Sequence, residues 1–252
     1  MQQLDGVALV TGAAKRIGAA IALRLARAGC DVVVHHRAST PEAEAVCQRI
    51  RALGRKAWAV QADLAVAQDR ERLLEDAQAA AGAPVRHLVN NASSFPRTTL
   101  ETMDRAGFHA ALDVDAWAPF ELTRRLHAAG CPAGVVTVLD ARLHDPDPNR
   151  ISYHLAKRLS AELVSLAARR YAPLVRVNGV APGPVLAQVD APAGAPGPSG
   201  KGLPLQRPPS PEDIADATAF LLGSQAITGT VVPVDGGRHL VGPALPRGAS
   251  ET

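Results

Sequence analysis

The sequence predicts an α/β fold of the doubly wound kind, in which a parallel sheet of seven strands is covered by helices on both faces. Short apolar runs alternate with longer amphipathic stretches along the chain, which is the order of elements typical of such sheets. A glycine-containing turn separates the first apolar run from the first helix pattern. The 252 residues contain no internal repeat and no shift in composition, so we expect a single domain over residues 1–252.

The predicted strands are apolar runs bounded by glycine, proline or polar residues. The first is GVALV and the second is DVVVHH, which is rich in β-branched valine. AWAVQ and VRHLVN follow, and then GVVTVL, VRVNGVA and TVVPVD. Because these runs are apolar at successive positions, both faces of the sheet should be buried. The strands are expected at residues 6–10, 31–36, 57–61, 85–90, 134–139, 175–181 and 230–235.

The predicted helices lie between these strands and repeat their apolar residues every three or four positions. The first helix ends at Gly29, because glycine adopts the left-handed conformation common after a helix. Thr40 is expected to cap the second helix, with Pro41 in its first turn. Ser210 is expected to cap the last, where Glu212 suits the positive helix end. The helices are expected at residues 17–29, 40–53, 66–81, 101–112, 116–129, 151–171 and 211–222.

Two segments lack any periodicity. Residues 184–209 are dense in proline, glycine and alanine, and this composition predicts a mobile loop. The tail, from about residue 239 to 252, is also rich in proline and glycine and is expected to be loose.

Composition excludes several classes of protein. Apolar residues make up 47% and charged residues 20%, so the chain is not disordered. No apolar run reaches about 18 residues, and the start of the chain does not resemble a leader, so we expect a cytoplasmic protein with no membrane partner. Cys30, Cys47 and Cys131 are too widely spaced for a CxxC pair or a metal site. The net charge of +3 includes no basic block, so no nucleic-acid partner is expected.

The turn after the first strand has the pattern T-G-x3-R-x-G, with Gly12 near its start and Gly18 at its end. Small residues there let backbone amides approach a pyrophosphate at the helix N-terminus. Arg16 stands where the common dinucleotide-binding pattern has a middle glycine. The preceding strand and the following helix supply the context that this motif requires.

The end of the second strand indicates which dinucleotide binds. An acidic residue there would accept a hydrogen bond from a ribose hydroxyl and repel a 2′-phosphate, but this chain has His35, His36 and Arg37. Arg37 can bind phosphate through two parallel hydrogen bonds, with Lys15 or Arg16 across the same pocket. We therefore expect NADPH rather than NADH; a solvated arginine at a strand end is the alternative.

Polar and small residues follow the third and fourth strands. Asp63 is placed to accept a hydrogen bond from an adenine amino group. The NNAS segment ends the fourth strand, where small and amide residues allow close packing against a cofactor ribose. In isolation Asp63 is equally compatible with an ordinary loop, and the NNAS segment is more typical of an ordinary turn.

Tyr153 and Lys157 lie four residues apart, so a helix places them on one face. A nearby ammonium lowers the pKa of a phenol, which would let Tyr153 donate a proton near neutral pH. Asp140, at the end of the fifth strand, could bind the same substrate atom.

TGAAKRIG, NNAS, YHLAK, VNGVAPGP and VDGG together, in this order over residues 6–240, resemble the short-chain dehydrogenase/reductase family. The resemblance implies a nicotinamide cofactor in a Rossmann-type fold, Tyr153 as the proton donor and Lys157 as the residue that binds the ribose hydroxyls. It also implies that the loop at 184–209 covers a small-molecule substrate, and that the chain forms a homotetramer.

Within that family the sequence is most similar to pteridine reductases and the related dihydromonapterin or dihydrofolate reductases. Arg16 with the HHR segment looks like their NADPH-specific pair. Ser93 and Phe95 stand where those enzymes hold the pterin, with the phenyl ring stacked on the substrate. Asp140 replaces the usual catalytic serine, and a carboxylate suits a heterocycle with protonatable nitrogens. The implied reaction is hydride transfer from NADPH to a C=N bond of a pterin-like ring.

The expected cofactor contacts are Gly12, Lys15, Arg16, Ile17, His36, Arg37, Ser39, Asp63, Leu64, Asn91, Ala92, Ser93, Tyr153, Lys157, Pro182 and Gly183. The expected substrate contacts are Arg16, Ser93, Phe95, Asp140 and Tyr153, and catalysis is assigned to Asp140, Tyr153 and Lys157. No metal is expected.

Two departures from the family pattern keep alternatives open. Asp115 stands where the family has an asparagine, and it could hold a water or pair with Lys157. The loop at 184–209 does not resemble that of any particular pterin enzyme. The alternatives are a reductase of another imine or ketone, and a non-catalytic NADP-binding protein.

Overall fold

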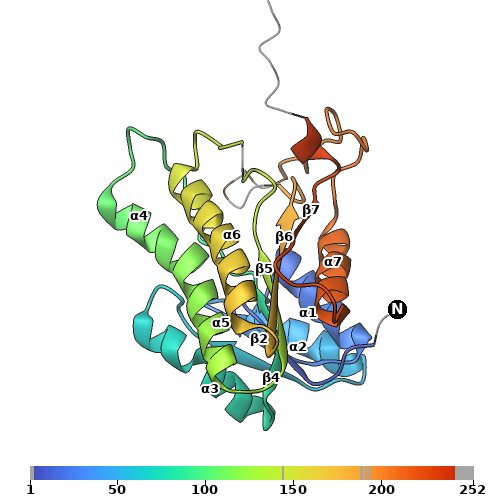
Figure 1. Ribbon diagram of the computed structural model, residues 1–252. Coiled ribbons are helices and arrows are strands. Elements are labelled where there is room, and N and C mark those ends of the chain that lie inside the picture. The colour runs from blue at the N-terminus through green and yellow to red at the C-terminus, as the bar shows by residue number, and fades with distance from the viewer. Residues whose placement is uncertain (1–2, 144, 188–189, 191, 193, 242–252) are drawn as a thin grey trace, which may run out of the picture.

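The computed structural model describes residues 3–143, 145–187, 190, 192 and 194–241, and it confirms the predicted α/β architecture (Figure 1). The strands are β1 (Val7–Val10), β2 (Asp31–His36), β3 (Ala57–Gln61), β4 (Val85–Asn90), β5 (Ala133–Val138), β6 (Val175–Pro182) and β7 (Val231–Val234). All neighbouring pairs are parallel, in the order β3-β2-β1-β4-β5-β6-β7.

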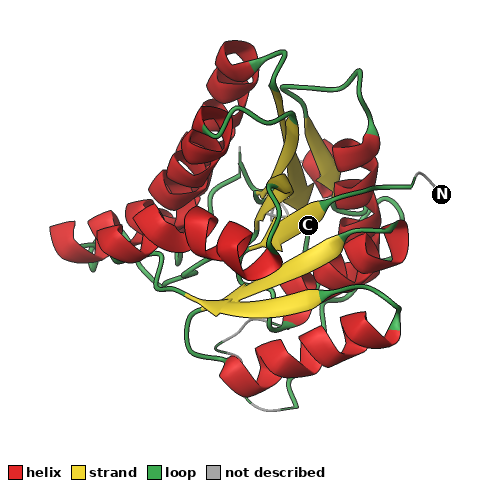
Figure 2. Ribbon diagram, turned by 90° about the horizontal axis from the view of Figure 1, so that it is seen from below, coloured by secondary structure: helices red, strands yellow, loops and turns green. Residues whose placement is uncertain are grey.

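Helices cover both faces of this sheet, as Figure 2 shows. They are α1 (Arg16–Ala28), α2 (Thr40–Ala52), α3 (Ala67–Ala81), α4 (Arg105–Leu112), α5 (Ala118–Ala128), α6 (Ile151–Tyr171) and α7 (Pro211–Gly223). Helices α1, α2 and α7 pack on one face, and α3, α5 and α6 pack on the other.

The core consists of two apolar clusters, one on each face of the sheet. Strand β1 contributes Ala8 and Val10 to the cluster beneath α1 and α7, and Val7 and Leu9 to the cluster beneath α5 and α6. This division follows from the alternation of side chains along a strand. Complete burial of a leucine such as Leu9 stabilises the fold by about 1.5–3 kcal/mol.

The strand order reverses between β1 and β4. From β1 the chain passes outward to β2 and β3, and then returns to add β4 on the other side of β1. At such a switch point the connections leave on opposite faces of the sheet, and a crevice opens at the carboxyl ends of the strands. The motifs singled out in the sequence all lie at this edge.

Three local features differ from the sequence prediction. Ser39, not Thr40, precedes the first helical residue of α2, and it makes no side-chain capping bond. Helix α4 begins only at Arg105, because the Asp104 carboxylate accepts a hydrogen bond from the Gly107 amide at 2.7 Å and caps the helix there. A π-helical turn (Asp113–Trp117) joins α4 to α5 without a break. The tail beyond residue 241 and part of the 184–209 loop lie outside the described residues.

Candidate active site

A cavity of about 740 Å³ opens at the carboxyl ends of the strands, at the switch point. Its walls come from the β1–α1 turn, the ends of β2, β4, β5 and β6, and one face of α6. Every residue expected in the site lines this cavity except His36. The sequence therefore named residues that meet in one cavity, although they come from distant parts of the chain, but about half of the lining was not among them.

His36 was expected to contact the cofactor, but His35 lines the cavity in its place. Successive side chains of a strand point to opposite faces, so only one of the two can face the β1–α1 turn. His35 does so: its Nδ1 accepts a hydrogen bond from the Gly12 amide at 3.1 Å, and its Nε2 pairs with the Ala62 carbonyl at 3.0 Å. Burial lowers the pKa of His35 to about 4, so the ring is neutral and can accept from Gly12.

The glycines of the β1–α1 turn are required by close backbone packing. A Cβ on Gly18 would lie 2.2 Å from the Gly12 carbonyl oxygen and 2.6 Å from Nδ2 of Asn91. Gly12 has φ of +62°, and a Cβ there would lie 3.0 Å from the Cα of Ala92. The turn thus leaves no room for side chains at two positions, as a phosphate-binding turn requires.

Asn91 fastens this turn to the end of β4. Its side-chain amide donates to the carbonyls of Thr11 at 2.9 Å and Gly12 at 3.1 Å. The Thr11 hydroxyl in turn accepts from the backbone amides of Asn91 and Ala92. The two segments that the sequence assigned to phosphates and ribose are therefore one rigid unit.

Cationic side chains surround the same end of the cavity. Arg37 follows β2 directly and lines the cavity. Lys15 pairs with Glu42 at 2.7 Å, with both side chains about half exposed. Arg16 has φ of +54° and donates to the Ala187 carbonyl at 2.7 Å, which ties the turn to the start of the 184–209 loop.

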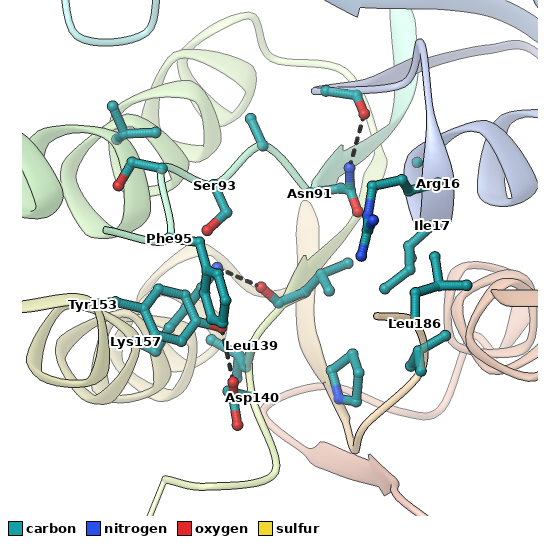
Figure 3. Close-up of a pocket in the computed structure, with 18 of the residues that line it drawn as sticks. Arg16, Ile17, Asn91, Ser93, Phe95, Leu139, Asp140, Tyr153, Lys157 and Leu186 are labelled. Carbon is teal, nitrogen blue, oxygen red and sulfur yellow. Dashed lines mark hydrogen bonds between the residues drawn. The ribbon is translucent and has the colours of Figure 1, made fainter. Parts of the chain in front are cut away.

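Tyr153, Asp140 and Lys157 form a corner at the other end of the cavity (Figure 3). The Tyr153 hydroxyl donates to Oδ2 of Asp140 at 2.9 Å. Lys157 Nζ donates to the Val138 carbonyl at 2.9 Å and lies 3.4 Å from Oδ1 of Asp115. In the view of Figure 3 this corner faces Arg16 and Ile17 across the cavity.

The predicted lowering of the Tyr153 pKa by Lys157 is wrong for this chain. Burial raises the pKa of the phenol, and the carboxylates of Asp140 and Asp115 raise it further. Lys157 Nζ lies 5.7 Å from the centre of the tyrosine ring but only 3.4 Å from Asp115. The charge of Lys157 is therefore paired with a carboxylate, and this pairing weakens its effect on the phenol.

Phe95 stands beside this corner with φ of +46°, a backbone conformation that non-glycine residues rarely adopt. Its ring meets the Tyr153 ring edge to face, with centroids 4.7 Å apart. The Arg150 guanidinium lies 3.8 Å from the ring centroid and donates to the Phe95 carbonyl at 2.7 Å. A planar ligand stacked on Phe95 must therefore use the face opposite Arg150.

Arg150 is the functional candidate that sequence reasoning missed most completely. It is buried at the start of α6, and its guanidinium binds both oxygens of the Asp190 carboxylate, at 3.0 and 2.9 Å. Arg97 pairs with the same carboxylate. A residue of the 184–209 loop is thus attached to the wall that carries Phe95, a link that sequence spacing does not reveal.

These features define a class of protein: a nucleotide-dependent oxidoreductase with a phosphate-binding turn at one end of the crevice and a tyrosine–lysine corner at the other. A sequence profile described as enoyl-(acyl carrier protein) reductase matches residues 12–239. The chain belongs to the short-chain dehydrogenase/reductase family.

Relatives in this family have several functions. An uncharacterised oxidoreductase of Mycobacterium tuberculosis is 35% identical, and the match covers 92% of each chain. Pteridine reductase 1 of Leishmania tarentolae is 34% identical over 93% of this chain and 96% of its own. The 3-oxoacyl-[acyl-carrier-protein] reductase FabG of Aggregatibacter actinomycetemcomitans is 32% identical over 91% and 97%.

Among solved structures, the alternative dihydrofolate reductase 1 FolM of Brucella canis, complexed with NADP, superimposes with a TM-score of 0.87. It shares 32% identity, and the match covers 96% of this chain and 97% of that one. Within the described residues, no helix is long and apolar enough to cross a bilayer.

Proposed function

We propose that this protein is an NADPH-dependent reductase that transfers hydride to a C=N bond of a pterin-like substrate, such as a dihydropteridine, dihydromonapterin or dihydrofolate. The observation that carries the proposal is the Asp140 carboxylate, which accepts the Tyr153 hydroxyl beside Phe95 in the cavity. A carboxylate can accept hydrogen bonds from the N–H groups of a reduced heterocycle. A simple ketone has no N–H group to offer it.

The cofactor end of the cavity fits NADPH. The β1–α1 turn excludes side chains where a pyrophosphate would approach the start of α1. Arg37 and Ser39 lie at the end of β2, where no acidic residue stands to repel a 2′-phosphate. Asn91, Ser93 and Lys157 would hold the nicotinamide ribose and ring. When bound, NADPH supplies the hydride.

The substrate end fits a flat, polar ring. The Phe95 ring lines the cavity and could stack on a flat ligand, and Ser93 and Asp140 line the cavity beside it. Hydride adds to the carbon of the C=N bond, and the π electron pair moves to the nitrogen. The Tyr153–Asp140 pair supplies that nitrogen with its proton. Likeness to pteridine reductase 1 and to FolM supports this choice of substrate.

A ketone of a biosynthetic pathway is the second candidate. The observation that favours it is the 32% identity to FabG, whose name describes reduction of a 3-oxoacyl group. Loss of the usual catalytic serine to Asp140 argues against it, because a ketone oxygen requires hydrogen-bond donors.

The test is a substrate panel, followed by the fall in NADPH absorbance. It contains dihydrobiopterin, dihydromonapterin and dihydrofolate, with a cyclic imine and a 3-oxoacyl thioester as comparisons. We expect fast turnover of at least one pterin and little of the thioester. Turnover of the thioester with silent pterins would overturn the proposal in favour of the ketone reductase.

A further inference from the structure

Asp115 is a buried carboxylate for which the proposed reaction has no assigned use. It lies within the π-helical turn (Asp113–Trp117) between α4 and α5, against α6, and none of its surface is exposed. An unpaired charge at such a site would destabilise the fold. Turns of this kind are frequent at functional sites.

The two oxygens of Asp115 contact two different parts of the active site. Oδ2 accepts from the Ser94 hydroxyl at 2.6 Å and from the Ser94 amide at 3.2 Å. Oδ1 lies 3.4 Å from Lys157 Nζ. Asp115 therefore links the lysine of the reacting corner to the segment that carries Phe95.

Several charged side chains around the corner are paired with a group of opposite sign. Lys157 of α6 pairs with Asp115 of the π-helical turn, and Arg150, at the start of α6, pairs with Asp190. In the β5–α6 loop, Arg142 pairs with Asp147 at 2.8 Å. His154 of α6 stays neutral near pH 7, because burial lowers its pKa.

A further carboxylate of the corner, Asp140, lies at the end of β5. Among the described residues, its hydrogen-bond partners are the neutral Tyr153 hydroxyl and the Arg142 backbone amide. Burial and the carboxylates of Asp140 and Asp115 raise the pKa of Tyr153, and the Arg150 guanidinium lowers it. Negative charge nearby keeps a phenol protonated.

We propose that Asp115 is a positioning residue whose carboxylate neutralises the charge of Lys157. Tyr153 therefore stays protonated, and continues to donate its hydrogen bond to Asp140, up to a higher pH than it would if Lys157 had no carboxylate partner. The consequence for the reaction rests on the proposed function. The ionisation of Tyr153 does not, and it can be measured with neither cofactor nor substrate.

The direct test is a titration of tyrosinate absorbance in the full chain. The sequence contains two tyrosines, and the Tyr153→Phe variant supplies the signal of Tyr171 for subtraction. In the isosteric Asp115→Asn variant we expect Tyr153 to ionise at a pH lower by about one unit. The Ser94→Ala variant removes the hydrogen bond from the Ser94 hydroxyl but keeps the charge of Asp115, so Tyr153 should ionise at the same pH as in the wild type. A titration of Asp115→Asn that overlays the wild type would overturn the proposal.

A double variant tests the charge balance separately and protects against a folding defect in the single one. Asp115→Asn with Lys157→Met removes both charges of the pair, so Tyr153 should ionise in the wild-type range. If Lys157 acted on Tyr153 directly and Asp115 were only structural, the double variant would ionise at a clearly higher pH, and the proposal would fail. Circular dichroism through the titration shows which variants are folded.

The pH profile of kcat/KM gives a second readout. In the Asp115→Asn variant, the basic limb of the profile should move to lower pH by the same amount as the phenol titration. In the Ser94→Ala variant, the basic limb should keep its wild-type position. An unmoved limb alongside a moved titration would contradict the role in the reaction. If no pterin is turned over at all, the proposed function fails, but the titration still decides the role of Asp115.

Discussion

At the scale of single residues, the proposed reaction depends on Asp140. Its carboxylate accepts the Tyr153 hydroxyl at 2.9 Å and the Arg142 amide at 2.7 Å, so it is oriented before any substrate arrives. A serine at this position would offer a neutral hydroxyl that can donate to a carbonyl oxygen. A carboxylate offers only acceptors, and this restricts the atom that it can hold to one that carries hydrogen.

Tyr153 should be indispensable for turnover. Because burial and two carboxylates raise its pKa, the phenol is protonated throughout the physiological range and is available as a donor. Tyr153→Phe should reduce kcat by a factor of about 10² to 10⁴ and leave the Kd for NADPH nearly unchanged. Steady-state rates and fluorescence titration measure the two effects. Tyr171→Phe, at the far end of α6, is the control; activity close to wild type in Tyr153→Phe would refute the assignment.

Arg37 should set the preference for NADPH. Arg37→Asp removes a phosphate-binding cation and adds a carboxylate at the end of β2, so we expect the Kd for NADPH to rise at least about tenfold, with a smaller change for NADH. Arg49→Asp, on the exposed side of α2, makes the same change of charge away from the cavity. Equal losses for both cofactors in Arg37→Asp would rule out contact with the 2′-phosphate.

At the scale of elements, strand alternation decides which residues reach the site. The seven strands were predictable within a residue or two, because continuous apolar runs between amphipathic stretches have few other solutions. The choice between His35 and His36 depends on which face of β2 meets the Gly12 turn. That is a tertiary relation between β1 and β2, and the sequence pattern HHR is compatible with either histidine.

His35 should make the stability of the protein sensitive to acid. Its pKa is about 4 in the folded chain and 6.5 in the unfolded one, so below pH 6.5 the unfolded state binds a proton that the folded state does not. The free energy of unfolding therefore falls by about 2 kcal/mol between about pH 7 and pH 5, whereas above pH 7 His35 has no effect on it. Urea unfolding measures it. A His35→Gln variant should show a shallower acid loss, and an identical loss would contradict this role.

Links between distant elements were the least predictable part of the site. Arg150 binds Phe95 and Asp190, and Asp115 binds Ser94 and Lys157. Each contact joins residues far apart in the sequence. Pairing of Asp115 with Lys157 was one of two alternatives for that residue, but no local pattern reveals the partners of Arg150 or the contact with Ser94. The tyrosine and lysine four residues apart on α6, by contrast, were readable because helix geometry alone brings them to one face.

At the scale of the whole molecule, several large apolar side chains are exposed on the surface. Leu155, Leu159 and Leu166 share one face of α6 and are 38%, 45% and 62% exposed. Trp117, which precedes α5, is 48% exposed, and Phe220 of α7 is 56% exposed. Such surfaces commonly mark interfaces between proteins. They support the expected homotetramer, which we propose as the assembly in solution.

Light scattering coupled to size exclusion tests the assembly. We expect a mass of four times the 26.2 kDa chain. Leu159→Glu should split the assembly, because it places a charge in the apolar face of α6. Leu53→Glu, at the end of α2, makes the same change on the opposite side of the sheet and should leave the mass unaltered. A wild-type mass of one chain would exclude the tetramer.

In the proposed function, the corner formed by Asp140 and Tyr153 takes part in the reduction of a C=N bond. The most direct measurement is the ratio of kcat/KM for dihydrobiopterin to that for a 3-oxoacyl thioester, in the wild type and in Asp140→Ser. We expect the wild type to favour the pterin strongly, and Asp140→Ser to lose most of the pterin rate and to move the ratio toward the ketone. A wild-type ratio that favours the thioester, or one that Asp140→Ser does not change, would contradict the account.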